Sequence, residues 1–349
     1  MKLLNFGSCL SFSVTCRIDK YHHGQAQELL KINRLGCVRF NRIDRFVNTY
    51  IHRSVPEVPI TYLQQLDLDW PEILPAEPKG ALGQIYNQLS DYHLGTGFSK
   101  RLSTPLLEGL EQECPDVVIY DDFFDVKQKV LYPTASEYRE SSIFFNTKLV
   151  PDYKRYFTFD EQYLDVKAVV QGYRDLTAFL RKRNPAVKIF FIGYSHLHHR
   201  SPLIRHRQVQ LQAAARQALM DVFYIPPVPI PEQFRKPGDP IHWRAWGDRN
   251  LNDDYAWIVD RIITENWTPR DWTIYLEQVG TENLLDTAYR DRTADPAIGS
   301  AIRTSSTDIS TGALPMPTSS ERAPTADRTS TPPHSPSLSS VAPEPMWPQ

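Results

Sequence analysis

Short apolar segments, each long enough for one buried strand, constrain this chain more than any other feature. Three of them are residues 2–6, 117–120 and 187–193, and each ends at small or polar residues. Residues 37–40 form a weaker candidate and residues 221–225 a fifth. Apolar runs of this kind are typical of parallel strands that are covered on both faces.

Amphipathic patterns lie between these segments. The clearest spans residues 160–182, where Val166, Val169, Tyr173 and Leu176 recur at steps of three and four residues. The same spacing predicts helices over residues 25–33, over residues 209–220 and, as a final helix, around Tyr255, Ile258, Val259 and Ile262. Strands that alternate with helices predict an α/β fold, a three-layer α/β/α sandwich around a doubly wound, flavodoxin-like parallel sheet.

Two parts of the sequence do not follow this alternation. Residues 56–104 are rich in proline and predict an irregular insertion. In residues 293–349, Pro, Ser and Thr dominate and large apolar residues almost vanish, so we expect a disordered tail. The folded part is therefore predicted to be one α/β domain over residues 1–292.

Charge and hydropathy exclude several classes of protein. The 349-residue chain has 39 Lys and Arg against 41 Asp and Glu, a net charge of −2, which argues against a nucleic-acid partner. No segment has the roughly 20 consecutive apolar residues that cross a bilayer. The first 15 residues do not match a signal peptide. We therefore expect a cytoplasmic protein without a membrane span.

The cysteines give no sign of a disulfide framework. There are four of them, and none forms a C-x-x-C pair: Cys9, Cys16, Cys37 and Cys114. A chain of this length can build its own apolar core. A disulfide scaffold and a structural zinc site are therefore not expected.

The first candidate site follows the first predicted strand, in the run Gly7-Ser8-Cys9-Leu10. Ligands of doubly wound sheets bind at the carboxyl ends of strands, and a thiol at a helix N-terminus has its thiolate stabilised. Ser8 is a rival nucleophile beside Cys9. The alternative is a small Gly-Ser turn with a buried, inert cysteine behind it.

The second candidate site lies late in the chain, at Asp239-Pro240-Ile241-His242. Residues three apart face the same side of a helix, so one helical turn would let the carboxylate of Asp239 orient the imidazole of His242. The alternative is that Asp239 caps a helix and Pro240 opens it. The two interpretations are compatible, because a cap also fixes the aspartate.

In this order, the two motifs resemble those of the SGNH, or GDSL-like, hydrolase superfamily. Gly7-Ser8-Cys9-Leu10 matches its opening G-D-S-L block with cysteine in the nucleophile position, as in the GSC or GNC branches, among them GSCFA-type and polysaccharide-biosynthesis proteins. Asp239, His242 and Gly247 match its closing block. The resemblance implies an esterase or acyltransferase with a Cys9–His242–Asp239 catalytic triad, no cofactor, and an acylated carbohydrate or polysaccharide precursor as substrate.

The resemblance also implies an oxyanion hole, and here the sequence departs from the family. Asn41 is the substitute after the second strand, whereas Asp121 and Asp122 stand where the family has asparagine. A carboxylate repels an oxyanion unless it is protonated or turned away. Alternatively, both aspartates close the strand and hold the following turn. A non-catalytic protein that binds a glycan or a partner is therefore the alternative function.

Aromatic and histidine residues complete the candidates. His196 and His198 follow the strand that ends at residue 193, and we expect His196 to line the cleft or contact substrate. A metal-dependent hydrolase built on this pair is a third hypothesis, but no Asp, Glu or Cys stands near it at metal-ligand spacing, so no metal is expected. Trp243, next to His242, is expected at a sugar-binding surface.

Overall fold

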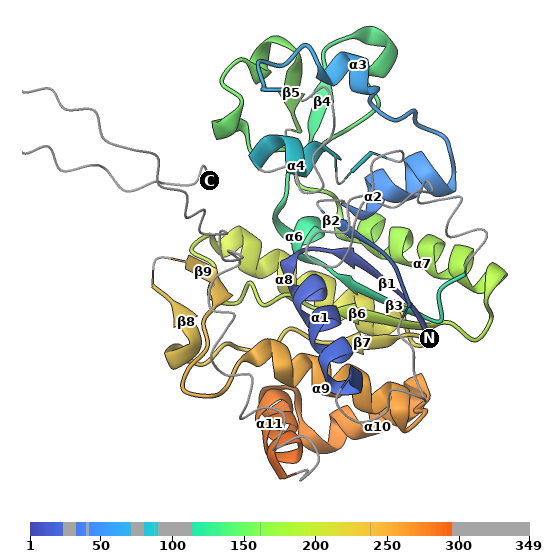
Figure 1. Ribbon diagram of the computed structural model, residues 1–349, viewed down its shortest axis with the longest axis vertical. Coiled ribbons are helices and arrows are strands. Elements are labelled where there is room, and N and C mark those ends of the chain that lie inside the picture. The colour runs from blue at the N-terminus through green and yellow to red at the C-terminus, as the bar shows by residue number, and fades with distance from the viewer. Residues whose placement is uncertain are drawn as a thin grey trace, which may run out of the picture. The chain divides into compact units, whose positions relative to one another are not determined.

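The computed structural model describes residues 1–23, 33–39, 42–70, 80–86, 88–89, 114–160, 162–237 and 239–294. A five-stranded parallel sheet lies at its centre, in the order β2–β1–β3–β6–β7 (Figure 1). The strands are β1 (Lys2–Gly7), β2 (Asn33–Arg39), β3 (Val117–Asp121), β6 (Lys188–Ile192) and β7 (Phe223–Ile225). All five predicted strands are confirmed, and β2 begins earlier than its apolar run indicated.

The strand order reverses between β1 and β3. The chain runs from β1 outward to β2, and then returns to place β3 on the other side of β1. In doubly wound sheets, ligands bind outside the carboxyl ends of the strands at such a reversal. The fold therefore marks the ends of β1 and β3 as the place to look for a site.

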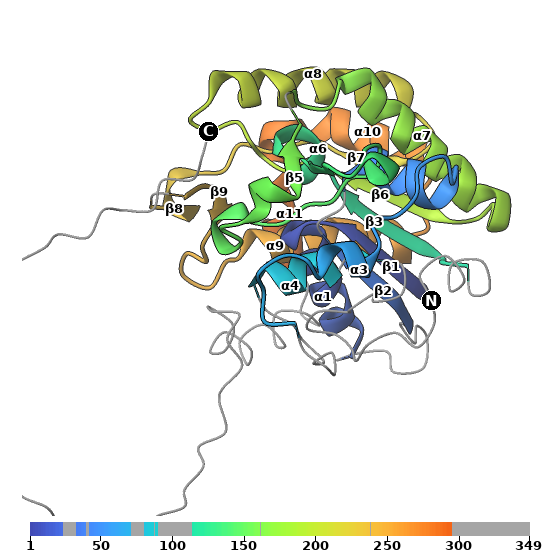
Figure 2. The ribbon, with the colours of Figure 1, turned by 90° about the horizontal axis from the view of Figure 1, so that it is seen from above.

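Helices pack against both faces of the sheet. Along β3, Val118 and Tyr120 lie in one apolar cluster, whereas Val117 and Ile119 lie in another. Figure 2 shows α7 and α8 on one side of the sheet and α1 on the other. The main helices are α1 (Cys9–His23), α7 (Val166–Arg183), α8 (Pro202–Ala218), α9 (Leu251–Thr264), α10 (Pro269–Val279) and α11 (Leu284–Ala294). Burial on both faces explains why the strands are apolar throughout.

The helices of the structure agree with the predicted helices only in part. The pattern over residues 160–182 corresponds to α7, which starts at Val166 because Asp165 accepts the N–H groups of Lys167 and Ala168. The pattern over 209–220 is the second part of α8. The helix around Tyr255 is α9, but it is not the last one, since α10 and α11 follow. The helix expected over residues 25–33 lies outside the described residues, apart from residue 33, which begins β2.

A separate lobe stands beside the sheet, at the top of Figure 1. Its elements are α3 (Ile60–Leu63), α4 (Gly80–Tyr86) and the antiparallel pair β4 (Leu131–Pro133) and β5 (Phe157–Phe159). Side chains from both chain segments share one core, including Leu63, Ile85, Ile143 and Phe157. The described part of the predicted insertion over residues 56–104 is therefore half of a small folded unit, completed by residues 131–159.

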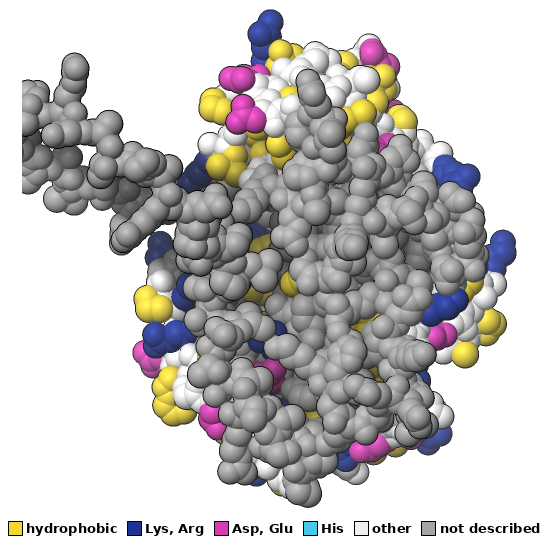
Figure 3. All heavy atoms as spheres, in the orientation of Figure 1, with side chains coloured by type: hydrophobic (Ala, Val, Ile, Leu, Met, Phe, Trp, Pro, Cys, Tyr) yellow, Lys and Arg dark blue, Asp and Glu magenta, His cyan; other side chains and the backbone are white. Residues whose placement is uncertain are grey.

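The remaining expectations concern the surface and the tail. No helix in the described ranges is long and apolar enough to span a bilayer. On the face seen in Figure 3, Lys and Arg side chains alternate with Asp and Glu around the described surface. Of the predicted tail, residues 293–294 end α11, and residues 295–349 lie outside the described part of the chain.

Candidate functional site at the carboxyl ends of β1 and β3

The turn between β1 and α1 is built around the carboxylate of Asp121, the last residue of β3. The Oδ2 atom of Asp121 accepts hydrogen bonds from the backbone N–H groups of Ser8 (2.8 Å) and Ser11 (3.0 Å). Its Oδ1 atom accepts one from the N–H of Phe123 (3.2 Å). A carboxylate in this position satisfies N–H groups that a helix start leaves unpaired, and it meets the positive end of the helix dipole. The neighbouring strand thus fixes the turn.

Glycine at position 7 is required by this arrangement. Its φ is +128°, a conformation that other residues rarely adopt. A Cβ at this position would also lie 2.9 Å from Oδ2 of Asp121 and 3.0 Å from its backbone nitrogen. The chain therefore turns tightly at Gly7, and the close contact with Asp121 explains why a larger residue does not fit.

The two nucleophile candidates differ in position. Cys9 is the first residue of α1, as expected, and its side chain lies outside the described residues. The side chain of Ser8 is buried, and its Oγ accepts the N–H of Leu10 (3.2 Å). Ser8 therefore serves as a cap of α1. Which of the two residues is reactive stays a prediction.

Asp121 itself is buried among donors. Burial raises the pKa of its carboxyl, while the hydrogen bonds from Ser11 and Ser8 act in the opposite direction. Its oxygens face the turn, which matches the interpretation that this residue closes the strand and holds the next segment. The N–H of Ser8 is consequently engaged by Asp121.

Asp122 connects β3 to the next strand and to α8. Its Oδ1 accepts the backbone N–H of Tyr194 (2.6 Å), and its Oδ2 accepts from Nε2 of Gln208 (3.0 Å). Burial raises the pKa of this carboxyl well above its usual value, and the bonds from Tyr194 and Gln208 oppose the rise. Both contacts are structural, so Asp122 also matches the strand-closing interpretation.

A third buried aspartate stands beside the other two, and the sequence reasoning missed it. Asp125 accepts the N–H of Ile43 (2.8 Å) and the hydroxyls of Tyr120 (2.5 Å) and Tyr173 (2.7 Å). Burial raises its pKa to about 7. The sequence did contain a signal for it, since three aspartates fall within five residues at the end of an apolar strand. Carboxylates placed there must find hydrogen-bond partners inside the fold.

The segment with Asp239 and His242 does not form the predicted helical turn. It is the strand β9 (Asp239–Trp243), antiparallel to β8 (Arg235–Lys236). Pairing with β8, together with the bond from the N–H of Arg244 to the carbonyl of Phe234 (2.8 Å), extends the chain here. The register of β9 against β8 is irregular within this span, so strand alternation does not assign positions 239 and 242 to faces. The side chains of Asp239 and His242 lie outside the described residues.

An aromatic stack anchors β9 to the sheet. The ring of Trp243 stacks on Tyr194, with centroids 5.5 Å apart, and on Tyr255 at 6.0 Å. Trp243 was expected at a sugar-binding surface, but it is partly buried against the apolar core. The ring therefore contributes to packing, and its role at a sugar-binding surface stays a prediction. Tyr194 and Tyr255, which the sequence reasoning did not single out, hold the strand that carries His242.

His196 belongs to the same aromatic group. Its ring is fully buried, stacked on Phe123 at 5.4 Å and tilted against Tyr194 at 5.6 Å. His198 is partly exposed, and burial is the largest cause of its lowered pKa. In the described part of the chain, no three His, Cys, Asp or Glu side chains are grouped to hold a metal ion. The contacts thus place His196 in packing at the end of β6.

Contacts join the two ends of the predicted site. Ser8 donates to Asp121, the next residue Asp122 accepts from Tyr194, and Tyr194 stacks on Trp243, the neighbour of His242. In Figures 1 and 2, the β8–β9 hairpin lies beyond the carboxyl ends of the parallel strands, on the side of the sheet away from the N-terminus. The structure thus brings the backbone of the β1–α1 turn and that of β9 to one edge of the sheet. Asn41 lies outside the described residues.

Comparisons with known proteins add no relative. No family model matches the chain, and neither the curated proteins nor the solved structures contain a significant match.

Proposed function

We propose that this protein is an acyl ester hydrolase or acyltransferase that uses Cys9 as nucleophile and His242 as proton carrier. We also propose that its fold is a three-layer sandwich of the flavodoxin-like or SGNH type. The proposed substrate is an acylated carbohydrate or polysaccharide precursor. Its main support is the position of Cys9. This residue opens the 15-residue helix α1 where the strand order reverses, and a buried network holds that turn.

The position suits thiol chemistry. The first N–H groups of a helix and its dipole favour a negative charge, and so lower the pKa of a thiol placed there. Asp121 already accepts two of these N–H groups, those of Ser8 and Ser11. We propose that the backbone N–H of Cys9 stabilises the oxyanion, because this donor belongs to the same residue as the nucleophile.

The reaction has two steps. The thiolate of Cys9 attacks the ester carbonyl carbon, the bond from this carbon to the alcohol oxygen breaks, and the imidazolium of His242 gives its proton to the departing alcohol. A thioester on Cys9 results. Water or an acceptor hydroxyl then attacks the thioester carbonyl, His242 takes the proton of the attacking group, and the Cys9 thiolate leaves.

Asp239 has a weaker place in this scheme. Residues 239 and 242 lie on a strand and not on one helical turn, so their spacing no longer places the two side chains together, and we expect Asp239 to contribute less than a triad aspartate on the same helical turn. Its replacement by asparagine should reduce turnover less than His242→Ala does.

Turnover of p-nitrophenyl acetate tests the proposal. Cys9→Ala should abolish it, and His242→Ala should reduce it by about 10² to 10⁴, the usual effect of losing a general acid–base group. The control is Cys114→Ala, which removes a second cysteine, outside the site. Turnover that survives Cys9→Ala, or a wild-type protein that turns over no ester, would contradict the proposal.

A non-catalytic glycan-binding protein is the second candidate. The observation that favours it is the carboxylate of Asp121, which occupies the strand end where an oxyanion hole would have a neutral donor. Glycan binding by a wild-type protein that never becomes acylated would favour this function.

A further inference from the structure

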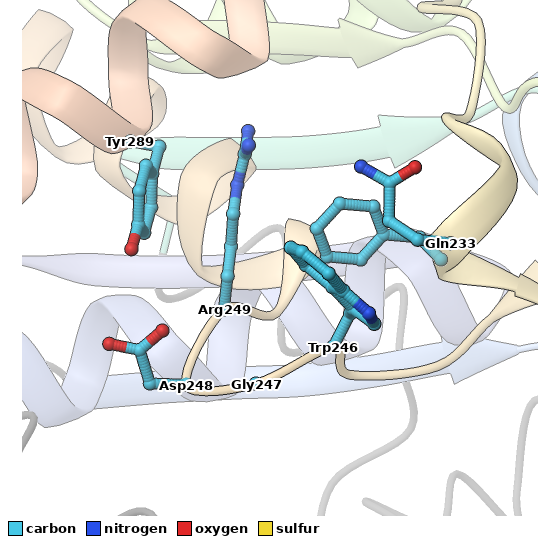
Figure 4. Close-up of a pocket in the computed structure, with 7 residues that line it drawn as sticks. Gln233, Trp246, Gly247, Asp248, Arg249 and Tyr289 are labelled. Atoms are coloured by element: carbon cyan, nitrogen blue, oxygen red, sulfur yellow. The ribbon is translucent and has the colours of Figure 1, made fainter.

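A pocket lies next to the β8–β9 hairpin, away from the β1–α1 turn. Its volume is about 170 Å³, close to the roughly 150 Å³ of a cavity that admits one benzene ring. The lining residues come from the short helix before β8, the loop after β9, and α11. They are Gln233, Phe234, Trp246, Gly247, Asp248, Arg249 and Tyr289 (Figure 4).

The guanidinium of Arg249 is fixed on one side of this pocket. It lies over the ring of Tyr289 at 4.5 Å and over that of Phe234 at 5.3 Å. Its Nε donates to Asp254 (2.8 Å), and its two terminal nitrogens donate to Asp286 (2.7 Å) and to the carbonyl of Leu285 (2.9 Å). Each guanidinium nitrogen thus already has an acceptor, and both rings are held in place.

Trp246 is exposed and yet held. More than half of its surface, 56%, is accessible, although large aromatic side chains are usually covered. Its backbone exchanges hydrogen bonds with Arg249 across a turn in which Gly247 has a φ of +60°. The anchored arginine therefore fixes the backbone of Trp246, and the indole itself lies edge-on to Phe234, with ring centroids 6.0 Å apart. Preorganised aromatic surface of this kind is characteristic of ligand sites.

The charged side chains around the pocket limit the class of ligand that can bind there. An anion is disfavoured because it meets the exposed carboxylate of Asp248, and because the charge of Arg249 is already paired with Asp254 and Asp286. A cation is disfavoured because it would share the pocket with the fixed positive charge of Arg249, which lies over Phe234 and Tyr289. A neutral ring with hydroxyl groups fits better, since Asp248 accepts hydrogen bonds and the amide of Gln233 both donates and accepts them. In Figure 4, Gln233 and Asp248 lie on opposite sides of the pocket with Trp246 between them.

We propose that this pocket binds one pyranose ring of a carbohydrate. The C–H face of the sugar packs on the electron-rich face of Trp246, and sugar hydroxyls bind Asp248 and Gln233. The site was not among the sequence candidates, which pointed to Trp243.

The pocket adjoins the segment that carries His242. Trp246 follows His242 by four residues, so their backbones are at most about 14 Å apart. A sugar held in the pocket could therefore present an ester on itself or on the next ring to the site. This role as a substrate subsite rests on the proposed acyl chemistry, whereas binding of the sugar does not.

Binding of methyl α-glucopyranoside, methyl β-galactopyranoside and methyl α-mannopyranoside to the full chain tests the proposal by saturation-transfer NMR and calorimetry. We expect at least one of them to bind, with saturation strongest on the C–H protons of one ring face. Trp246→Ala should raise its Kd at least about tenfold, as the loss of a stacking aromatic does for other ring ligands. Trp246→Phe should retain part of the affinity.

Matched variants locate the effect. Trp267→Ala removes another partly exposed tryptophan outside the pocket and should leave Kd unchanged. Asp248→Ala and Gln233→Ala alter exposed side chains and should weaken binding without unfolding the protein. Cys9→Ala should bind as the wild type does, so that a failure of the acyl chemistry and a failure of this site are distinguishable. The proposal is overturned if no pyranoside binds, if Trp246→Ala binds as tightly as the wild type, or if tetramethylammonium or phosphate binds the pocket instead.

Discussion

The β1–α1 turn and the loop after β9 each contain a glycine with positive φ, but the surroundings of the two glycines are opposite. A Cβ at Gly7 would lie 2.9 Å from the carboxylate of Asp121, whereas a Cβ at Gly247 would meet nothing within 4 Å. The proposed nucleophile therefore starts from a turn embedded in buried polar contacts. The pocket loop has open space around it. We infer that the turn before Cys9 leaves no room for a side chain at position 7, whereas the pocket loop has room for one at position 247.

Substitution of the two glycines should affect the stability of the protein very differently. Gly7→Ala should lower the free energy of unfolding by roughly 2 to 5 kcal/mol, because it combines a strained backbone with a clash against Asp121. Gly247→Ala should cost about 1 kcal/mol, from backbone strain alone. Chemical denaturation measures both values. Equal effects at the two positions would show that the turn is not held as the contacts indicate.

The pH dependence of stability probes the buried aspartates beside the turn. Burial raises the pKa of Asp125 from 3.8 to about 7 in the folded protein. Between these values the folded state keeps a proton that the unfolded state has lost, so the free energy of unfolding decreases as the pH rises from about 4 to 7. The change is on the order of 4 kcal/mol.

Asp125→Asn isolates this contribution, because the neutral amide keeps the shape of the carboxyl and does not titrate. Denaturation curves of both proteins from pH 4 to 8 should show a flatter profile for the variant, with the largest gain relative to the wild type at the alkaline end. Parallel profiles would mean that Asp125 titrates at its ordinary value.

Two tryptophans in and after β9 differ in burial: Trp243 is packed between other rings, and Trp246 is exposed. Trp243 packs between Tyr194 and Tyr255, so Trp243→Ala should cost about 2 to 3 kcal/mol, somewhat less than a fully buried aromatic. Trp246→Ala should change stability by no more than about 0.5 kcal/mol, because the ring is exposed. Thermal unfolding compares them. A larger loss for Trp246 would reverse the roles assigned to the two rings.

Ser8→Ala is expected to have the smallest effect at the turn. Loss of the bond from the N–H of Leu10 should cost about 1 kcal/mol, as for other helix caps. Ester turnover should be retained, since Ser8 is not the proposed nucleophile. A variant that folds but loses turnover would transfer the reactive role from Cys9 to Ser8.

The sheet could be predicted from the sequence, and the lobe could not. The strands are buried on both faces, so each is a continuous apolar run that can be recognised in the sequence without knowledge of the fold. The lobe core joins Leu63 and Ile85 to Ile143 and Phe157, which lie far apart in the chain and show no local period. Only tertiary contacts define such a unit.

Within the candidate site, position could be predicted but orientation could not. The turn with Cys9 follows β1 as expected, because a glycine-containing motif after an apolar run is a local signal. Whether Asp121 faces a ligand or the backbone N–H groups depends on a strand more than a hundred residues away. The segment from Asp239 to His242 has the composition of a helix start, and its pairing with β8 makes it a strand instead.

The central claim is that the thiol of Cys9 forms an acyl intermediate with the help of His242. Intact mass spectrometry after brief exposure to p-nitrophenyl acetate, followed by peptide mapping, tests it most directly. The account predicts one acetyl group on Cys9, its absence in Cys9→Ala, slower formation in His242→Ala, and an unchanged signal in Cys114→Ala. A wild-type protein whose Cys9 peptide stays unmodified, or is labelled no faster than the Cys114 peptide, would contradict it.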